Sequence, residues 1–221
     1  MSNKPIALEA LRAATRDAHQ RLEDDLRVAR PDANRDDYLH YLQDLRGWML
    51  PFDADLWRAA WPAEIEPHAR AGKIEWIDCD LRASGMSQDA IHALPLAGFT
   101  PDLATLPARF GIAYVIEGAQ LGTKVLARAL APRLAPWSPR WLAGYGDGNA
   151  KQWRTFVKCV ESSLTTADMQ RIAAMAAADA FASLADWFAL RRQARLDGGL
   201  TDEGRASLPA ASANDHSQAV T

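Results

Sequence analysis

Cysteine is scarce in this chain: its 221 residues include only Cys79 and Cys159. They form no CxxC pair, and this usage fits a reducing compartment. The start of the chain, residues 1–7, lacks an apolar signal segment, and no run approaches the 18 apolar residues of a membrane span. We therefore expect a cytoplasmic protein with no membrane partner.

An excess of positive charge is also missing. The chain carries 25 Lys and Arg against 28 Asp and Glu, a net charge of −3. That balance does not favour a broad surface for nucleic acid, so we expect no nucleic-acid partner. Convincing alternation of apolar and polar residues, the pattern of a strand, is absent as well.

What is present is helical periodicity. The pattern predicts an all-α fold, a compact single-domain helical bundle over residues 1–197, followed by a flexible C-terminal tail over residues 198–221. Asn34 is expected to cap the helix that follows it, and Ser87 is expected to cap a short turn that extends to Ala93. The predicted helices cover residues 8–28, 35–49, 52–61, 67–82, 106–131, 149–161 and 165–196.

The helix over residues 8–28 carries the first candidate site. Its apolar stripe follows Leu8, Leu11, Thr15, Ala18, Leu22 and Leu26. His19 lies at the edge of this stripe, with Arg16 at i−3, Arg12 at i−7 and Glu23 at i+4. One helix face thus offers an imidazole, two guanidinium groups and a carboxylate to a single neighbour, which is either another helix or a ligand.

Most histidines of this kind are solvated or core residues rather than metal ligands. Glu23 favours the ligand role, because it can accept from one ring nitrogen of His19 and leave the other for a metal. Arg12 and Arg16 can pair with the carboxylates of a bound anion, or they form a solvated edge in which Arg16 pairs with Glu23 or Asp17.

The second candidate site is a row of glycines in the helix over residues 106–131. Gly111, Gly118 and Gly122 fall at i, i+7 and i+11, on one face. Each glycine costs a helix about 1 kcal/mol relative to alanine, so something approaches this face closely. Tight helix–helix packing is the commoner reason, and a flat ligand against bare backbone is the alternative.

Two motifs together resemble the haem oxygenase family. The first is L-R-x-x-T-x-x-x-H-x-x-x-E at residues 11–23, and the second is Y-V-I-E-G-A-Q-L-G at residues 114–122. The resemblance is nearest to the bacterial branch that supplies biliverdin to phytochromes. It implies a mostly helical fold in which haem lies between a proximal and a distal helix.

The resemblance also implies roles for individual residues. His19 matches the iron ligand and Glu23 the residue that orients it, while Arg12 and Arg16 match positions near the haem propionates. Gly118 and Gly122 match the distal glycines that leave room for bound O₂. Lys151 and Arg154 are further candidates for the propionates.

The implied activity is oxidative cleavage of haem, which serves as both substrate and cofactor, to biliverdin, CO and Fe²⁺. No flavin or nicotinamide fingerprint is present, so electrons are expected from a partner, a ferredoxin or a flavoprotein reductase. A bacteriophytochrome is a candidate recipient of the bilin.

One position departs from the family pattern. Many members carry Asp directly after the first distal glycine, where this chain has Ala119. Glu117 and Gln120 can replace it in proton delivery only if their side chains face the ligand. A non-catalytic haem-binding or trafficking protein therefore stays an alternative. A thiaminase-like helical hydrolase is another, and it would need a nucleophilic Cys79 or Cys159.

Overall fold

The structure of the chain is a computed structural model that describes residues 6–206, with side chains for residues 6–197. Every described element is helical, so the predicted all-α class is confirmed. Internal contacts divide the chain into two units, Met1–Trp187 and Phe188–Thr221, and the account below concerns the first. The α-helices are α1 (Ile6–Asp25), α2 (Arg35–Met49), α3 (Asp53–Arg58), α4 (Pro67–Arg70), α5 (Lys73–Ala83), α6 (Gln88–His92), α7 (Leu106–Leu134), α8 (Arg140–Ala143), α9 (Asn149–Ser163) and α10 (Ala167–Ala206).

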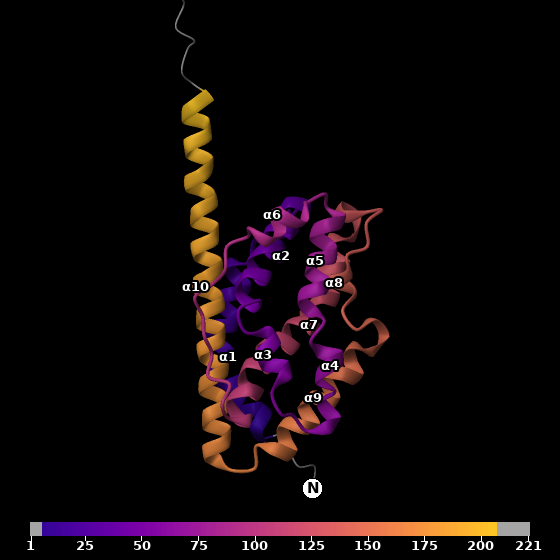
Figure 1. The fold of residues 1–221 in the computed structure, drawn as a ribbon, viewed down its shortest axis with the longest axis vertical. Helices are drawn as coiled ribbons and strands as arrows, with labels where there is room; N and C mark the ends of the chain where they lie inside the picture. The colour runs from indigo at the N-terminus through magenta and orange to yellow at the C-terminus, as the bar shows by residue number, and fades with distance from the viewer. Residues whose placement is uncertain (1–5, 207–221) are drawn as a thin grey trace, which may run out of the picture. The chain divides into compact units, whose positions relative to one another are not determined.

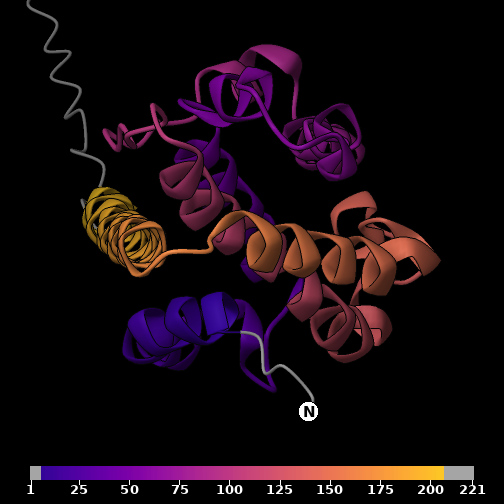
Figure 2. The same ribbon diagram turned by 90° about the horizontal axis from the view of Figure 1, so that it is seen from below.

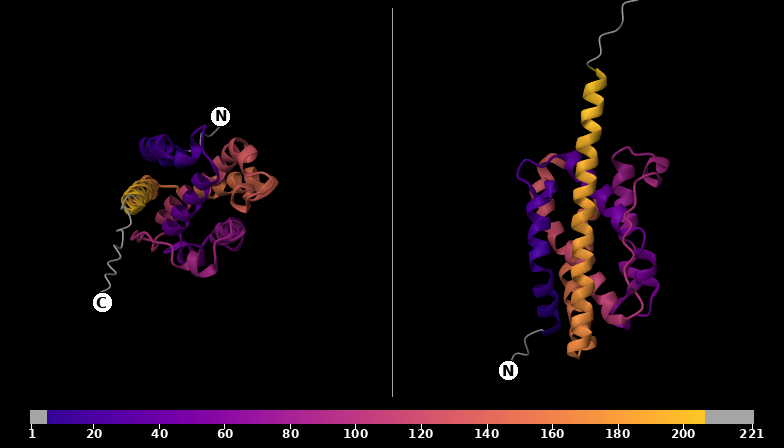
Figure 3. Two further views of the ribbon diagram at one scale, coloured as in Figure 1. Left: turned by 90° about the horizontal axis from the view of Figure 1, so that it is seen from above. Right: turned by 90° about the vertical axis from the view of Figure 1, so that its left-hand side faces the viewer.

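Helices α7 and α9 pack against each other. Figure 1 shows α7 in the centre with α9 at its lower end, and the end-on view of Figure 2 shows α9 crossing the middle of the fold. Helix α1 lies on one side of them and packs on α9, while α4 and α5 lie on the other side (Figure 2). The view from above in Figure 3 shows the same order. This arrangement places α1, which carries His19, and α7, which carries the glycines, in one unit.

Local sequence signals explain several helix starts. Asn34 caps α2 in a capping box, in which its Oδ1 accepts from Asp37 N at 3.0 Å and its N donates to Asp37 Oδ2 at 2.9 Å. Ser87 Oγ accepts from Ala90 N at 3.2 Å and caps α6. Both predicted caps are confirmed.

Helix α1 is capped by a distant residue instead. The carboxylate of Glu161, on α9, accepts from Leu8 N at 2.7 Å and from Ala7 N at 3.3 Å. These are orphan donors of the first turn, and a negative charge also suits that end of the helix. The contact joins α1 to α9 at the point where α1 begins.

The predicted apolar stripe of α1 is buried only in its first half. Leu8, Leu11 and Thr15 are buried, whereas Leu22 and Leu26 stay partly exposed. Helix α1 therefore docks through its N-terminal half, and the part around His19 is less covered. The helix also ends at Asp25 rather than near Val28, because a short 3₁₀ turn over Arg27–Ala29 follows it.

Other predicted boundaries were wrong. The single helix expected over residues 67–82 is two helices, α4 and α5, separated at Gly72. Helix α7 continues through Pro132 to Leu134, because a proline in the last turn interrupts few backbone hydrogen bonds. The short helix α8 was not predicted at all.

The predicted tail begins inside a helix. Helix α10 continues past residue 197 to Ala206, because two glycines there lower helix stability without forbidding the helix. Residues 207–221 lie outside the described part of the chain, so a flexible tail there stays a prediction.

By length and composition, residues Ala167–Asp197 of α10 could cross a membrane. This is weak evidence, because the core helix of a soluble protein meets the same criterion. Ala173, Ala177 and Ala180 are fully buried against the rest of the first unit.

Candidate functional site

His19 and Glu23 are both accessible on α1. Their side chains are 52% and 59% exposed, and His19 Nδ1 lies 3.5 Å from Glu23 Oε2. The His19 ring also contacts Phe181 of α10 edge to face, with ring centroids 5.4 Å apart. Burial on one side and exposure on the other leave the imidazole able to meet a ligand.

Arg12 and Arg16 are exposed on the same helix. Glu23 pairs with His19, and neither arginine forms an ion pair or hydrogen bond with a side chain or backbone group that the structure describes. The alternative in which Arg16 pairs with Glu23 or Asp17 is therefore not what the structure has. Two guanidinium groups stay available for an anion.

The three glycines of α7 have two different surroundings. A Cβ built on Gly111 would lie 2.2 Å from Ala173 O and 2.9 Å from Ala177 N, so α10 packs directly on the backbone there. A Cβ built on Gly118 or Gly122 would meet no atom of another described element within 4 Å. Helix packing explains the first glycine, and only the other two face open space.

Apolar side chains continue the open face of α7. Leu121 is 43% exposed and Val125 is 72% exposed, and with Gly118 and Gly122 they fall at i, i+3, i+4 and i+7. Exposed apolar groups in a row commonly mark a surface that a partner or ligand covers. We call these four residues the open strip of α7.

Glu117 and Gln120 face away from the open strip. Each is 3% exposed, on the buried side of α7. The Gln120 amide has no hydrogen-bond partner among the described residues, and its Oε1 lies against Gly144, where a Cβ would come within 2.5 Å. The condition set for these two residues as proton donors, that they face the ligand, is not met.

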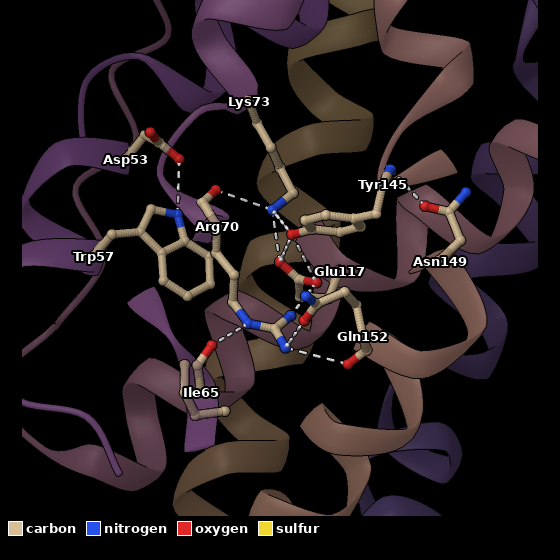
Figure 4. A network of polar contacts seen from close by, with 9 residues as sticks. All are labelled: Asp53, Trp57, Ile65, Arg70, Lys73, Glu117, Tyr145, Asn149 and Gln152. Carbon is tan, nitrogen blue, oxygen red and sulfur yellow. Dashed lines mark hydrogen bonds and ion pairs between the residues drawn. The ribbon is translucent and has the colours of Figure 1, made fainter. Parts of the chain in front are cut away.

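Glu117 is instead the centre of a buried cluster with Arg70, Lys73 and Tyr145, which we call the Glu117 cluster (Figure 4). Arg70 Nη1 pairs with Glu117 Oε2, and Lys73 Nζ lies 2.6 Å from Glu117 Oε1. Tyr145 Oη donates to both carboxylate oxygens, at 3.1 and 3.2 Å. A buried carboxylate needs such partners to offset the loss of water.

Burial changes the pKa values around this cluster. It lowers the pKa of Lys73, although Glu117 opposes the change, and it raises the pKa of Tyr145. Asp53 lies nearby and accepts from Trp57 Nε1 at 3.0 Å (Figure 4). Burial raises the pKa of Asp53 to about 6, against a lowering by the Lys73 charge and the Trp57 hydrogen bond.

Lys151 and Arg154 are exposed on α9. Arg154, at i−7 from Glu161, shares a face with this residue, which caps α1, and Lys151 lies one turn before Arg154. That places two more cations on the helix that supports α1.

Comparison with known proteins identifies the family of this chain. A family model described as Heme oxygenase matches residues 6–190. The chain belongs to the haem oxygenase family.

Two relatives illustrate the match. A haem oxygenase of Xanthomonas campestris pv. campestris (strain 8004) is 38% identical over 90 residues, which are 40% of this chain and 50% of that protein. The chain therefore matches about half the length of this curated relative. A crystal structure of the NO- and CO-bound haem oxygenase from Neisseria meningitidis has the same fold, with a TM-score of 0.66, 21% identity and coverage of 83% of this chain and 92% of that one.

The predicted site residues of this haem oxygenase family member lie on three helices of the first unit. The chain brings His19 and Glu23 together on α1, and on α7 no other described element lies within reach of a Cβ at Gly118 or Gly122. Their roles towards haem stay predictions, as do those of Arg12, Arg16, Lys151 and Arg154.

The Glu117 cluster is what sequence reasoning missed. One signal was available: Glu117 lies in an apolar stretch of a long helix, and a carboxylate buried there requires cations. The sequence does not say which cations, because Arg70 and Lys73 are more than 40 residues away and meet Glu117 only when α4, α5 and α7 pack.

The cysteines do not support a hydrolase that uses a thiol. Burial raises the pKa of both the exposed Cys79 and the buried Cys159, and Glu75 raises that of Cys79 further. A nucleophilic cysteine needs the opposite shift, because the thiolate is the reactive form.

Proposed function

We propose that this protein is a haem oxygenase that cleaves haem to biliverdin, CO and Fe²⁺ with O₂ and external electrons. The open strip of α7 is the observation that carries the proposal. Helix α10 closes the same face at Gly111, whereas at Gly118 and Gly122 bare backbone meets open space beside exposed Leu121 and Val125. A flat apolar substrate fits such a surface.

His19 is the proposed iron ligand on the other side of the substrate. Glu23 lies 3.5 Å from its Nδ1, close enough to favour one tautomer and leave Nε2 for the metal. Bound haem would supply the chemistry of O₂ activation and electron transfer. The protein would position the haem and control the access of water to it.

The proposed role of Gly118 and Gly122 follows from the absence of a side chain at each position. Without side chains they let the distal backbone approach the substrate and leave O₂ space on that side. Because Ala119 has no polar group and Glu117 and Gln120 are turned into the core, protons would come through ordered water held by backbone groups of α7.

Arg12 and Arg16 are the proposed partners of the haem propionates, since both are exposed and form no ion pair with a described residue. Lys151 and Arg154 on α9 are further candidates. Electrons would come from a ferredoxin or flavoprotein reductase, and the product would pass to a bacteriophytochrome. We place the reaction in the cytoplasm, with no role for nucleic acid or a membrane.

A haem carrier that does not turn over is the second candidate. The absence of an acidic or amide side chain on the open strip favours it, because no side chain there can deliver protons directly.

An absorption titration with hemin, followed by ascorbate in air, tests the proposal. Wild type should form a one-to-one complex with a Soret band, and ascorbate should replace that band with broad red absorption from bilin. His19→Ala should lose or shift the Soret band. His92→Ala, which changes an exposed histidine of α6, is the matched control and should behave as wild type.

The remaining outcomes separate the two candidates. A Soret complex that persists under ascorbate would identify a carrier. Absence of any saturable complex with wild type would refute both.

A further inference from the structure

We propose that the Glu117 cluster fixes the rotation of α7 and thereby selects which edge of a bound haem meets Gly118 and Gly122. Glu117 would be a positioning residue that determines product specificity. The inference rests on the proposed function and concerns residues other than the proposed iron ligand and propionate partners.

Adjacency in the helix links the cluster to the open strip. Glu117 directly precedes Gly118, and consecutive residues of an α-helix point about 100° apart. When the Glu117 side chain is held in one direction, the direction in which Gly118 and Gly122 face is fixed as well. The two functions therefore lie on different sides of one helical turn.

Both oxygens of the Glu117 carboxylate are held. Arg70 and Tyr145 bind Oε2, while Lys73 and Tyr145 bind Oε1 (Figure 4). The side chains of Arg70 and Lys73 are fully buried and that of Glu117 is 2% exposed. Water cannot easily replace these bonds, so the carboxylate has one favourable position.

The two cations are themselves fixed by other elements. Arg70 Nε donates to Ile65 O at 2.7 Å, and Arg70 Nη2 donates to Gln152 O at 3.1 Å. Lys73 Nζ donates to Arg70 O at 3.1 Å and lies 5.3 Å from the ring centroid of Trp57. The cluster thus ties α7 to α3, α4, α5 and α9 at the level of the open strip.

The geometry makes small rotations consequential. The Cα atoms of a helix lie at a radius of about 2.3 Å, so a rotation of about 20° moves Gly118 by roughly 0.8 Å. A displacement of about 1 Å is enough to change reaction rates by roughly 100-fold. A displacement of Gly118 by this amount would therefore change which of the bridging meso carbons at the haem edge reacts fastest.

The test compares the bilin isomers formed by wild type and Glu117→Gln. Each protein is loaded with one equivalent of hemin, reduced with ascorbate in air, and the products are separated by chromatography. We expect Glu117→Gln to bind hemin but to raise the share of minor isomers by roughly tenfold, because an isomer ratio reports the difference between two barriers. Glu117→Asp, which keeps the charge, should restore part of the wild-type ratio.

Asp78→Asn is the matched control. It breaks another buried ion pair, between Arg46 Nε and Asp78 Oδ1 at 2.5 Å, which joins α2 to α5 without involving α7. Both substitutions remove a buried ion pair, so an effect of lower stability on the isomer ratio should appear in both variants. An isomer ratio that changes equally in both, or in neither, would overturn the inference.

Two provisions keep the result decisive. If Glu117→Gln does not fold, Tyr145→Phe removes the hydroxyl bonds to Glu117 and the bond that the hydroxyl accepts from Lys73 Nζ, but it keeps both ion pairs of Glu117. It should change the ratio in the same direction by less. If wild type binds hemin without cleaving it, NMR of the ferric cyanide complex replaces the isomer assay. The haem methyl shifts should then differ between wild type and Glu117→Gln but not Asp78→Asn, and identical shifts would overturn the positioning role.

Discussion

At the scale of single residues, Gly111 and Gly122 separate two uses of glycine on one helix face. Gly111 is needed because the backbone of α10 lies where its Cβ would be, whereas Gly122 faces space that the described part of the chain leaves open. The same residue type therefore serves packing in one place and, in the proposed function, ligand access in the other.

This difference predicts opposite effects of the same substitution. Gly111→Ala should lower the free energy of unfolding by about 1–3 kcal/mol, because α10 must move. Gly122→Ala should raise it by up to about 1 kcal/mol, because alanine is the better helix former. Urea denaturation of the apoproteins measures both.

The added methyl group of Gly122→Ala should nevertheless reduce bilin formation, because it enters the space assigned to O₂. Bilin formation in this variant at the wild-type rate would contradict that assignment.

At the scale of elements, the position of α1 depends on its first turn. Glu161 binds two backbone donors at the start of the helix, while the half that carries His19 is only partly covered. His19, the proposed iron ligand, therefore lies more than ten residues along α1 from the turn that Glu161 holds.

Glu161→Ala should weaken hemin binding as well as stability. Loss of a helix cap costs about 1 kcal/mol, and because the cap joins α1 to α9 the loosened helix should bind hemin less tightly. Ser87→Ala, which removes the cap of α6, is the control. Ser87→Ala should lower the free energy of unfolding in urea by a similar amount and leave the hemin titration unchanged. Equal hemin affinity in both variants would show that the contact of Glu161 with α1 does not act on the site.

At the scale of the whole molecule, the interior contains a carboxyl group that folding makes harder to ionise. Burial raises the pKa of Asp53 from 3.8 to about 6. The folded protein therefore binds this proton more tightly than the unfolded chain. The stabilisation is complete below pH 4 and is lost as the pH rises through 6.

Asp53→Asn should remove this pH dependence. Between pH 4 and pH 7 the unfolding free energy of wild type should fall relative to Asp53→Asn by up to about 3 kcal/mol, since one pKa unit corresponds to 1.36 kcal/mol. Urea titrations across this range measure the difference. Asp55→Asn changes an exposed residue of α3, and its unfolding free energy should vary with pH as that of wild type does. If the unfolding free energies of wild type and Asp53→Asn instead varied with pH in the same way, the raised pKa of Asp53 would be contradicted.

The sequence by itself determined the all-α class, the positions of most of the long helices, the local caps of α2 and α6, and the resemblance to the family. Periodicity, Asn34 and Ser87 act through residues a few positions apart, so they can be read directly along the chain. The spacing of His19 and Glu23 likewise follows from one helical turn, and it brings the two side chains together without help from other elements.

Only the tertiary structure decided which side each residue of α7 faces. Gly111, Gly118 and Gly122 are equivalent by spacing, and the approach of α10 distinguishes them. Glu117 turned out to be an internal anchor because Arg70 and Lys73 come to it from distant elements. Such contacts depend on how helices pack, and no local preference of the chain encodes them.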